Sequence, residues 1–333
     1  MKKKIITLLV ALMATVASVH AQQISVVAPN GATTLYRTFP DAIKGATAGS
    51  VVYLPGGGFS IPDSVKITKK LTIIGIGHKA KNDNVDGNTI INGNLWFNEG
   101  SSGSAVMGCY LSGDINIGEG NAEVNDVLIK YSNLNRVQVK NENCKATIIR
   151  QCYVRETSNF SGSNPLISNN IMKTIRHING GSISYNIFTG YNTDKINFAW
   201  GEYSVLAPNS TIKNNIGTPW GTYYGYKFVM GSENSSVIAN MTKGNLGEDP
   251  INIGDVDWDD VFVNYNGGAV STASNFHFKD EYKEYENQVG IYAGDGFSDG
   301  ALPPVPYIVA KKIDDKTDAA GKLNIKVRVK ASE

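Results

Sequence analysis

The sequence contains little cysteine. Its 333 residues include three cysteines, Cys109, Cys144 and Cys152. An odd number excludes a complete disulfide framework, and neither the cysteine nor the histidine spacing fits a zinc site. We predict buried, unpaired thiols at Cys109 and Cys152, and a Cys144–Cys152 disulfide stays open if the fold brings these two residues together.

Charged residues are also scarce, at 18% of the chain, and neither sign dominates. The formal net charge is +1, from 31 basic and 30 acidic residues, and it becomes −2 if Lys2, Lys3 and Lys4 leave with a signal peptide. A chain so close to neutral does not recruit nucleic acid or an anionic membrane through its bulk field. The hydrophobic content of 41% is that of a folded chain.

The sequence has no long apolar run after its first residues. Residues 1–21 have the three parts of a secretory signal peptide: a basic start, an apolar stretch over residues 5–16, and small residues leading to Ala21. This stretch is shorter than the roughly 20 residues that cross a bilayer. We therefore expect cleavage between Ala21 and Gln22 and an exported protein, secreted, periplasmic or displayed at the cell surface, without a membrane span.

What the sequence has in abundance is a short recurring phrase, an Asn or Cys followed by two mostly apolar residues. Its copies begin at Cys109, Asn133, Cys152, Asn170, Asn186, Asn215 and Asn240. Intervals of roughly two to three dozen residues, or a little less, indicate a solenoid. Each copy is therefore predicted to mark one coil.

Short β-branched runs lie between these copies, for example at residues 127–129, 146–149 and 236–239. They are too short for helices, and Gly, Asn and Ser interrupt them, which predicts strand, bend and strand again. Asn suits the bend because it tolerates left-handed backbone angles, and Asn side chains on coils about 4.8 Å apart can form a hydrogen-bonded ladder. We expect Asn170, Asn186 and Asn215 to form such a column.

A helix is predicted near the start of the exported chain, with Thr38 as its N-cap and Pro40 and Asp41 in its first turn. The phrase AIKGATAGSVVYLPGGGF, followed by KITKKLTIIGIGH, is similar to the opening of many secreted β-helix proteins. Over about residues 30 to 295 the chain resembles the bacterial right-handed parallel β-helix proteins of the pectin-lyase-like superfamily. The resemblance implies an all-β fold, a single-stranded right-handed parallel β-helix with an N-terminal cap helix and a C-terminal β-hairpin.

The predicted organisation is a signal peptide over residues 1–21, a right-handed parallel β-helix domain over 22–298, and a Pro-rich joint with a β-hairpin over 299–333. The segments 261–264, 276–278 and 289–294 resemble the closing coil of the same family. Alternating apolar and polar residues at 307–311 and 322–330 predict the hairpin, which either caps the stack or packs along it.

One hydrolase pattern of the superfamily is present in part. Polygalacturonase-like enzymes use several Asp residues, one of them in an Asn-Thr-Asp triplet, and this chain has Asn192, Thr193 and Asp194 in that order. The paired Asp, the Gly-His-Gly and the Arg-x-Lys of that pattern are missing, and hydrolysis needs a second carboxylate. Asp194 therefore stands alone as a catalytic candidate for hydrolysis.

Lyase chemistry supplies the other catalytic candidates. Pectate-lyase-like enzymes hold Ca²⁺ by acidic side chains and use an Arg or Lys as the base. Arg150, Arg155 and Arg176 lie in the predicted coils, and His177 is next to Arg176. We take Arg155, Arg176 and His177 as candidates, although the sequence shows no carboxylate partners for them in the coils.

The dense acidic group in the chain is formed by Asp255, Asp257, Asp259 and Asp260. It departs from an EF-hand loop at Asp260 and Asn266, where Gly and Glu are required. We expect a solvated acidic loop and predict no cofactor and no metal site, with Ca²⁺ at Asp255, Asp257 and Asp259 left as an open question.

Two long intervals, 189–210 and 217–235, are rich in aromatic residues. Loops that project from a rigid stack often carry binding function, and an aromatic face offers apolar contact to a sugar ring. The same rings would equally pack their own loops against the stack. The predicted ligand-binding residues are Trp200, Trp220, Tyr223, Tyr224 and Tyr226.

The sequence-based hypothesis is a secreted or cell-surface β-helix protein that interacts with polysaccharide or a cell-surface glycan, with catalysis undetermined. The first alternative is a pectate-lyase-like polysaccharide lyase with an Arg or Lys base and assistance from Ca²⁺; if the chain is an enzyme, we favour this reaction over glycoside hydrolysis. The second alternative is a structural or adhesive surface protein. Nucleic acid is not an expected partner.

Overall fold

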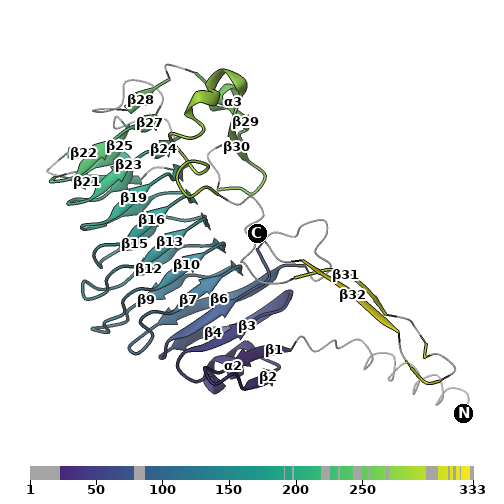
Figure 1. Ribbon diagram of the computed structural model, residues 1–333. Helices are drawn as coiled ribbons and strands as arrows, with labels where there is room; N and C mark the ends of the chain where they lie inside the picture. Colours follow the sequence, from purple (N-terminus) through teal and green to yellow (C-terminus); the bar gives the residue numbers. More distant parts are fainter. Residues whose placement is uncertain are drawn as a thin grey trace, which may run out of the picture.

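The computed structural model describes residues 23–78, 87–190, 192–196, 199–218, 226–231, 233–242, 250–253, 256–267, 270–297, 307–313, 316–317, 320–322 and 324–330 (Figure 1). The predicted signal peptide lies outside these residues. Most of the described chain forms two long sheets of 11 and 17 strands, in which parallel pairing predominates. The all-β prediction is confirmed, and the parallel sheets are consistent with a parallel β-solenoid.

The 11-stranded sheet forms one side of the stack, which we call face A. Its parallel strands are β3 (Ser50–Tyr53), β5 (Leu71–Ile74), β7 (Ala105–Met107), β10 (Leu128–Lys130), β13 (Ile148–Arg150), β16 (Leu166–Ser168), β19 (Ser182–Ser184), β23 (Thr211–Lys213) and β26 (Ser236–Ile238). Figure 1 shows these strands stacked one above another from the N-terminal end of the molecule upward.

The 17-stranded sheet contains two further rows of strands, because most coils contribute two strands to it. Face B consists of β8 (Tyr110–Leu111), β11 (Asn133–Leu134), β14 (Tyr153–Val154), β17 (Ile171–Met172), β20 (Ile187–Phe188), β24 (Ile216–Gly217), β27 (Asn240–Thr242) and β28 (Pro250–Asn252). Face C consists of β9 (Ile115–Ile117), β12 (Val137–Val139), β15 (Ser158–Phe160), β18 (Ile175–Arg176), β22 (Ala199–Leu206) and β25 (Tyr226–Met230). The long strands β4 (Gly57–Ile67) and β6 (Thr89–Phe97) pass through both faces.

An aliphatic column fills the interior behind face A. The parallel register pairs the central residue of each strand with that of the next, in the order Val52, Ile73, Val106, Ile129, Ile149, Ile167, Ile183, Ile212 and Val237. All of them except the terminal Val237 are fully buried. Because β-branched side chains pack well on a pleated surface, each rung supports the next.

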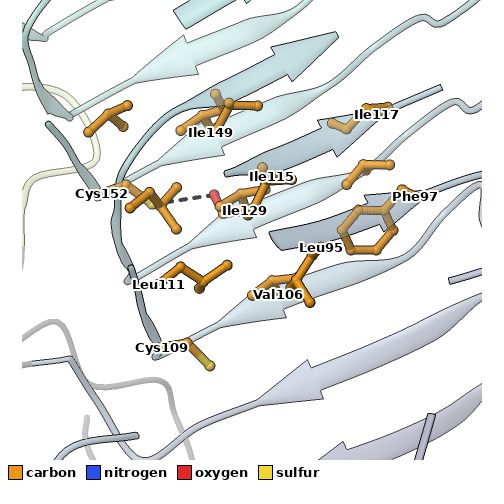
Figure 2. Packing of buried hydrophobic residues seen from close by; sticks show 14 of the residues in the cluster. Leu95, Phe97, Val106, Cys109, Leu111, Ile115, Ile117, Ile129, Ile149 and Cys152 are labelled. Carbon is orange, nitrogen blue, oxygen red and sulfur yellow. Dashed lines mark hydrogen bonds between the residues drawn. The ribbon is translucent and has the colours of Figure 1, made fainter. Parts of the chain in front are cut away.

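The three thiols are free, so the disulfide alternative does not apply. Figure 2 shows Cys109 and Cys152 beside the aliphatic column, with Cys152 Sγ 3.7 Å from the carbonyl oxygen of Ile129. Burial raises the pKa of both thiols to about 12. Cys144 is also buried. The predicted unpaired, buried state of Cys109 and Cys152 is confirmed.

A ladder of buried asparagines connects the last coils, as predicted. The Nδ2 atom of Asn170 donates to Oδ1 of Asn186, that of Asn186 to Asn215, and that of Asn215 to Asn240, each at 2.9 Å. The same Oδ1 atoms accept the backbone N–H of the preceding ladder residue, at 2.9 to 3.0 Å. Each side chain therefore satisfies buried polar groups of its own coil and of the next.

The left-handed bend belongs to the residue before the ladder, which corrects the sequence-based assignment of both roles to Asn. Positive φ values, between 48° and 67°, occur at Gly108, Tyr131, Gln151, Asn169, Tyr185, Asn214 and Ala239. A left-handed residue turns the chain sharply, so the next side chain faces the interior and can bond across coils. Bend and ladder are thus separate columns, offset by one residue.

The predicted start of the repeated phrase at Asn133 is one residue too late in the chain, because the residue equivalent to Cys109 and Cys152 is Ser132. Asn133 lies opposite Tyr110 and Tyr153 in register, whereas Cys109 and Cys152 precede those residues. The ladder position of this coil is Ser132, whose Oγ accepts the backbone N–H of Cys109 at 3.3 Å. Coil length, measured between bonded ladder residues, varies from 16 to 29.

The predicted N-terminal helix is α2 (Phe39–Gly45), and Thr38 is its N-cap, with Oγ1 accepting the N–H of Asp41 at 3.2 Å. Phe39, Ala42 and Ile43 are buried on one side. The helix packs against β4 and against β1 (Ile24–Val27) and β2 (Thr33–Tyr36), which extend face A in antiparallel pairing.

The segments predicted to close the solenoid do not join its parallel sheets. Within residues 256–297, which we call the outer lobe, β29 (Phe262–Asn264) pairs antiparallel with β30 (Asn275–Phe278), flanked by α3 (Trp258–Val261) and the 3₁₀ helix η1 (Asp280–Tyr285). The closing-coil prediction is therefore wrong. Its apolar residues instead pack with the outward side chains of face B, namely Tyr153, Ile171, Ile187, Ile216 and Met241. This second apolar cluster lies outside the coils.

Residues 288–296 of the outer lobe lie against the bends of three coils, where side chains of the left-handed residues bond to the backbone of the lobe. Asn214 Nδ2 donates to the carbonyl oxygen of Gln288 at 2.8 Å, and Gln151 Nε2 donates to that of Gly296 at 2.7 Å. Between them, Asn169 Nδ2 donates to two further carbonyl oxygens, at 2.9 and 2.7 Å. Three residues with left-handed backbone angles, Gln151, Asn169 and Asn214, therefore bind the backbone of the outer lobe.

The tail forms the predicted hairpin from β31 (Tyr307–Ile313) and β32 (Ile325–Lys330), which pair antiparallel. All six residues of β32 are exposed, so this strand does not pack along the stack. The predicted joint at residue 299 lies outside the described residues. None of the helices in the described part of the chain combines the length and apolar composition that a membrane crossing requires.

The ladder makes a stability prediction. Replacing Asn186 by alanine should lower the free energy of unfolding by about 2–4 kcal/mol, because buried donors and acceptors on two coils lose their partners. Urea unfolding followed by circular dichroism measures this change. The exposed Asn143 is the matched control, and Asn143→Ala should alter stability by less than about 0.5 kcal/mol. Equal transition midpoints for the two variants would show that the ladder does not stabilise the stack.

A carboxylate in the outer lobe makes a second prediction. Burial opposes ionisation of Glu286, but hydrogen bonds from the His277 ring and the backbone N–H of Phe278 outweigh it and hold the pKa of Glu286 below 4.5. A carboxyl pKa that is lower in the folded state stabilises the fold above the unfolded-state value, and the stabilisation is lost as pH falls through the folded-state value.

Glu286→Gln should therefore lower stability at neutral pH and flatten the loss of stability below about pH 4.5. Thermal unfolding measured from pH 7 to pH 3 tests this, with Glu281→Gln, at an exposed position, as the control. If the stability of Glu286→Gln falls as steeply with decreasing pH as that of the unchanged protein, Glu286 is not the source of the pH dependence.

Candidate functional site

The outer surface of face C differs from that of face B. On β6, β9 and β12 the pairs Leu95 and Phe97, Ile115 and Ile117, and Val137 and Val139 are buried, and each pair flanks one residue on the other side of the strand. Trp96 and Gln138 are partly exposed at this position, whereas Asn116 is only 4% exposed. Because successive side chains of a strand point to opposite sides, the outward position repeats on every coil. Face C therefore presents a column of its own.

This column, which we call the polar track, has no aliphatic member. The register places its residues opposite one another in the order Lys66, Trp96, Asn116, Gln138, Asn159 and Arg176. Neighbouring strands are about 4.8 Å apart, so the track crosses six successive coils with one aromatic ring, three amides and a cation at each end.

Trp96 is the aromatic member of the track and is partly exposed. Lys140 Nζ lies 5.8 Å from the centre of its indole ring and donates to Gln138 Oε1 at 2.7 Å. The lysine thus connects the ring to the amide two coils further on. An indole beside an ammonium and an amide offers both an apolar face and hydrogen-bonding groups.

Asp114 orders the polar side chains at the start of face C. Its Oδ1 accepts from Asn135 Nδ2 at 2.7 Å, and its Oδ2 accepts from Arg136 Nε at 2.6 Å and from Gln138 Nε2 at 3.1 Å. The carboxylate is largely buried. Since its acceptor positions serve three donors, we regard Asp114 as a residue that positions the track.

A surface hollow of about 690 Å³ adjoins the track at the corner between faces C and A. Its lining is polar apart from Ala122, and it consists of Thr68, Asn98, Glu99, Ser102, Glu119, Asn121, Ala122, Glu123 and Asn125. Lys66 of the track reaches Glu119 at 2.7 Å. Hydrogen bonds from Lys66 and then Asn98 lower the pKa of Glu119, so this carboxylate is an acceptor at neutral pH.

The predicted catalytic candidates do not converge on one place. Arg155 donates from Nε to the carbonyl oxygen of Leu134 at 3.2 Å and from Nη2 to that of Leu111 at 2.9 Å, with its guanidinium 4.9 Å from the Tyr110 ring. These bonds fasten successive coils of face B. Arg176 instead lies at the end of the polar track.

His177 is exposed and has a left-handed backbone with φ of 60°. It lines a second hollow of about 380 Å³ with Ile178, Asn179, Leu206, Pro208, Asn209, Gly231 and Glu233. Asp194 belongs to β21 (Asn192–Ile196), where its backbone pairs with Gly201 of β22.

Only part of the predicted aromatic platform falls in the described chain. Trp220, Tyr223 and Tyr224 lie outside the described residues. The backbones of Trp200 and Tyr226 are on β22 and β25, two neighbouring strands that continue face C beyond β18. The strands that carry Trp200 and Tyr226 therefore belong to the same face as the polar track.

Within the described ranges, no three His, Cys, Asp or Glu side chains lie close enough together to hold a metal ion. Asp255 lies outside those ranges, Asp257 is the N-cap residue of α3, and Asp259 lies in its first turn; both are exposed. The remaining described histidines pack against aromatic rings: His78 lies edge-on to Tyr153 at 5.3 Å, and His277 stacks on Tyr292 at 3.7 Å.

The sequence analysis missed Trp96, Asn116 and Gln138. Their signal is a triplet with an apolar aliphatic or aromatic residue on each side of Trp, Asn or Gln, which recurs after about 20 residues, at 95–97, 115–117 and 137–139. Aromatic density in the long intervals does not reveal these residues, because the register of short strands brings single residues of distant coils together.

No protein-family model matches this chain, and neither a curated protein nor a solved structure matches it.

The Asp114 network makes a third prediction. Asp114→Ala leaves Asn135, Arg136 and Gln138 without their shared acceptor and should lower the free energy of unfolding by about 1–3 kcal/mol. Urea unfolding measures the change, with Glu142→Ala, at an exposed position, as the control. A change no larger than that of the control would show that solvent replaces the carboxylate at no cost.

Proposed function

We propose that this chain is an exported β-solenoid protein that binds polysaccharide along face C, on the polar track and the adjoining hollow. The single observation that carries the proposal is the in-register column from Lys66 to Arg176, in which Trp96 is followed by three amide side chains. Catalysis is not part of this proposal.

The chemistry of the track suits a sugar chain. The C–H face of a sugar ring packs on an indole, while its hydroxyl groups donate to and accept from amides and carboxylates. Amides both donate and accept, so the partly exposed Gln138 and Asn159 match hydroxyl groups in either role. A ligand with repeating units matches a surface whose donors and acceptors repeat with every coil.

The predicted aromatic platform extends the same surface. Strands β22 and β25 follow β18 on face C, and Val205 lies opposite Ile175. Trp200, five residues before Val205 on β22, and Tyr226 on β25 lie on this face to one side of the track. A polysaccharide on the track would then run across the coils toward these residues. The platform and the track are two parts of one binding face in this proposal.

The proposal includes the finer features that the sequence implies. The stack is taken as right-handed, in line with the strong preference of parallel β connections for that hand, and related to the pectin-lyase-like superfamily. Helix α2, which buries Phe39, Ala42 and Ile43, serves as its N-terminal cap. Residues 1–21 act as a signal peptide that directs export.

A glycan panel tests the proposal. The chain without residues 1–21 is titrated with neutral and uronate-containing polysaccharides by calorimetry, and Trp96→Ala should weaken binding about tenfold or more, equivalent to at least about 1.4 kcal/mol. Tyr53→Ala is the control, because Tyr53 is an exposed aromatic residue on face A; its affinity should stay unchanged.

The panel also separates the alternatives. Loss of binding in Trp220→Ala but not in Trp96→Ala would locate the site in the aromatic intervals and overturn the track. New absorbance from unsaturated products, lost on changing Arg176, would establish a lyase. If the unchanged protein neither binds nor cleaves any glycan of the panel, the result would favour a structural or adhesive protein.

A further inference from the structure

The C-terminal hairpin exposes aliphatic and basic side chains in alternation. On β32, Ile325, Val327 and Val329 are 55%, 51% and 53% exposed. The residues between and after them, Lys326, Arg328 and Lys330, are exposed as well. Since strand side chains alternate between two sides, β32 carries an aliphatic row on one side and a basic row on the other.

The pairing with β31 follows this division at some positions and departs from it at others. Ile313 lies opposite Ile325, and Ile308 opposite Val329, whereas Lys312 lies opposite Lys326. Directly opposed residues of an antiparallel pair belong to the same side of a sheet. The register also places Lys311 opposite Val327 and Ala310 opposite Arg328, so the division into an aliphatic and a basic row holds for β32 and does not continue unbroken onto β31.

This concentration of exposed aliphatic residues is specific to the hairpin. In the rest of the described chain, large exposed apolar side chains occur singly, at Leu35, Tyr53, Leu166, Ile238 and Val263. A two-stranded hairpin is at best marginally stable alone in water. An aliphatic row on such a hairpin therefore indicates a surface that acquires a partner.

Local charge narrows the choice of partner. Residues 307–330 contain seven basic and three acidic residues, although the whole chain is nearly neutral. The outer lobe, with eight acidic and two basic residues between 256 and 297, offers the opposite charge. However, its described part exposes a single large aliphatic side chain, Val263, so a second copy would satisfy the basic row and leave the aliphatic row in water.

We propose that the hairpin β31–β32 binds the surface of an anionic lipid membrane without crossing it. Headgroup phosphates complement the basic row, and the boundary with the acyl chains receives the aliphatic row. The long stems of Lys326, Arg328 and Lys330 let the charged ends reach the headgroups while the strand lies flat. The hairpin thus attaches the stack to a membrane surface and leaves face C free.

The sequence-based expectation that no anionic membrane is recruited considered the bulk charge. In the net charge of the whole chain, the positive charge of the tail and the negative charge of the outer lobe cancel. The hairpin acts through its local charge, because the field of a membrane surface falls off within a Debye length, about 10 Å at moderate salt. Neutrality of the whole chain therefore does not oppose attachment through the tail.

Vesicle sedimentation tests the proposal with the chain lacking residues 1–21. Vesicles of equal parts phosphatidylcholine and phosphatidylglycerol should bind about tenfold more protein than pure phosphatidylcholine vesicles at low salt, and the difference should shrink at high salt. The double variant Lys326→Glu/Arg328→Glu should lose this preference. Val327→Thr/Val329→Thr, which keeps the β-branched shape, should weaken binding at every salt concentration.

Controls make the outcome independent of folding and of the glycan proposal. Lys70→Glu/Lys145→Glu changes the charge by the same amount as Lys326→Glu/Arg328→Glu, at exposed positions of the stack, and it should leave vesicle binding intact. The hairpin variants should keep the circular dichroism spectrum and any glycan affinity of the unchanged protein. Loss of vesicle binding with retained glycan affinity would separate the two functions.

Three results would overturn the proposal. The first is equal binding to anionic and neutral vesicles, or none to either. The second is binding that Lys326→Glu/Arg328→Glu leaves unchanged. The third is concentration-dependent self-association through the hairpin in light scattering, abolished by the same variant, without vesicle binding.

Discussion

The stack depends on one constraint: every coil must bring its buried residues into register with those of the coil below. The aliphatic column behind face A and the Asn ladder beside it are two expressions of this rule. A one-residue slip would turn Ile167 outward and leave the Asn170 amide without its partner. Variation in coil length is therefore confined to the segments between strands, where 16 or 29 residues are equally compatible with the same register.

That constraint leaves the outward residues free to differ between faces. From Tyr153 to Met241 the outward residues of face B are apolar and pack with the outer lobe. The side chains of Gln151, Asn169 and Asn214 hold the backbone of this lobe. The polar track of face C surrounds the partly exposed Trp96 with polar side chains, of which Asn116 is buried and Lys66, Gln138 and Asn159 are at least partly exposed. A solenoid thus assigns a role to each face by a single position per coil. The chemistry of a face is consequently distributed over residues that lie about 20 positions apart in the chain.

The binding properties of the charged residues also depend on where they lie in the fold, and not on the net charge of the chain. The near-neutral sum conceals an acidic outer lobe and a basic tail, and the Asp114 carboxylate is already committed to Asn135, Arg136 and Gln138. Similarly, Arg155 is committed to two backbone carbonyl oxygens. Which charges are available to a ligand is therefore decided by their neighbours and not by residue type.

The sequence by itself determined the strand-rich solenoid class, the Asn column at residues 170, 186 and 215, the N-capped helix at Thr38 and the tail hairpin, because each rests on local periodicity or turn chemistry. Only the tertiary structure decided that Ser132 takes the ladder position beside Asn133, that residues 256–297 cover face B instead of closing the stack, and that Trp96 shares a column with Gln138. These features depend on register between distant strands. The hydrogen bonds between whole coils select one register among those that the local sequence allows. No short window of sequence contains this information.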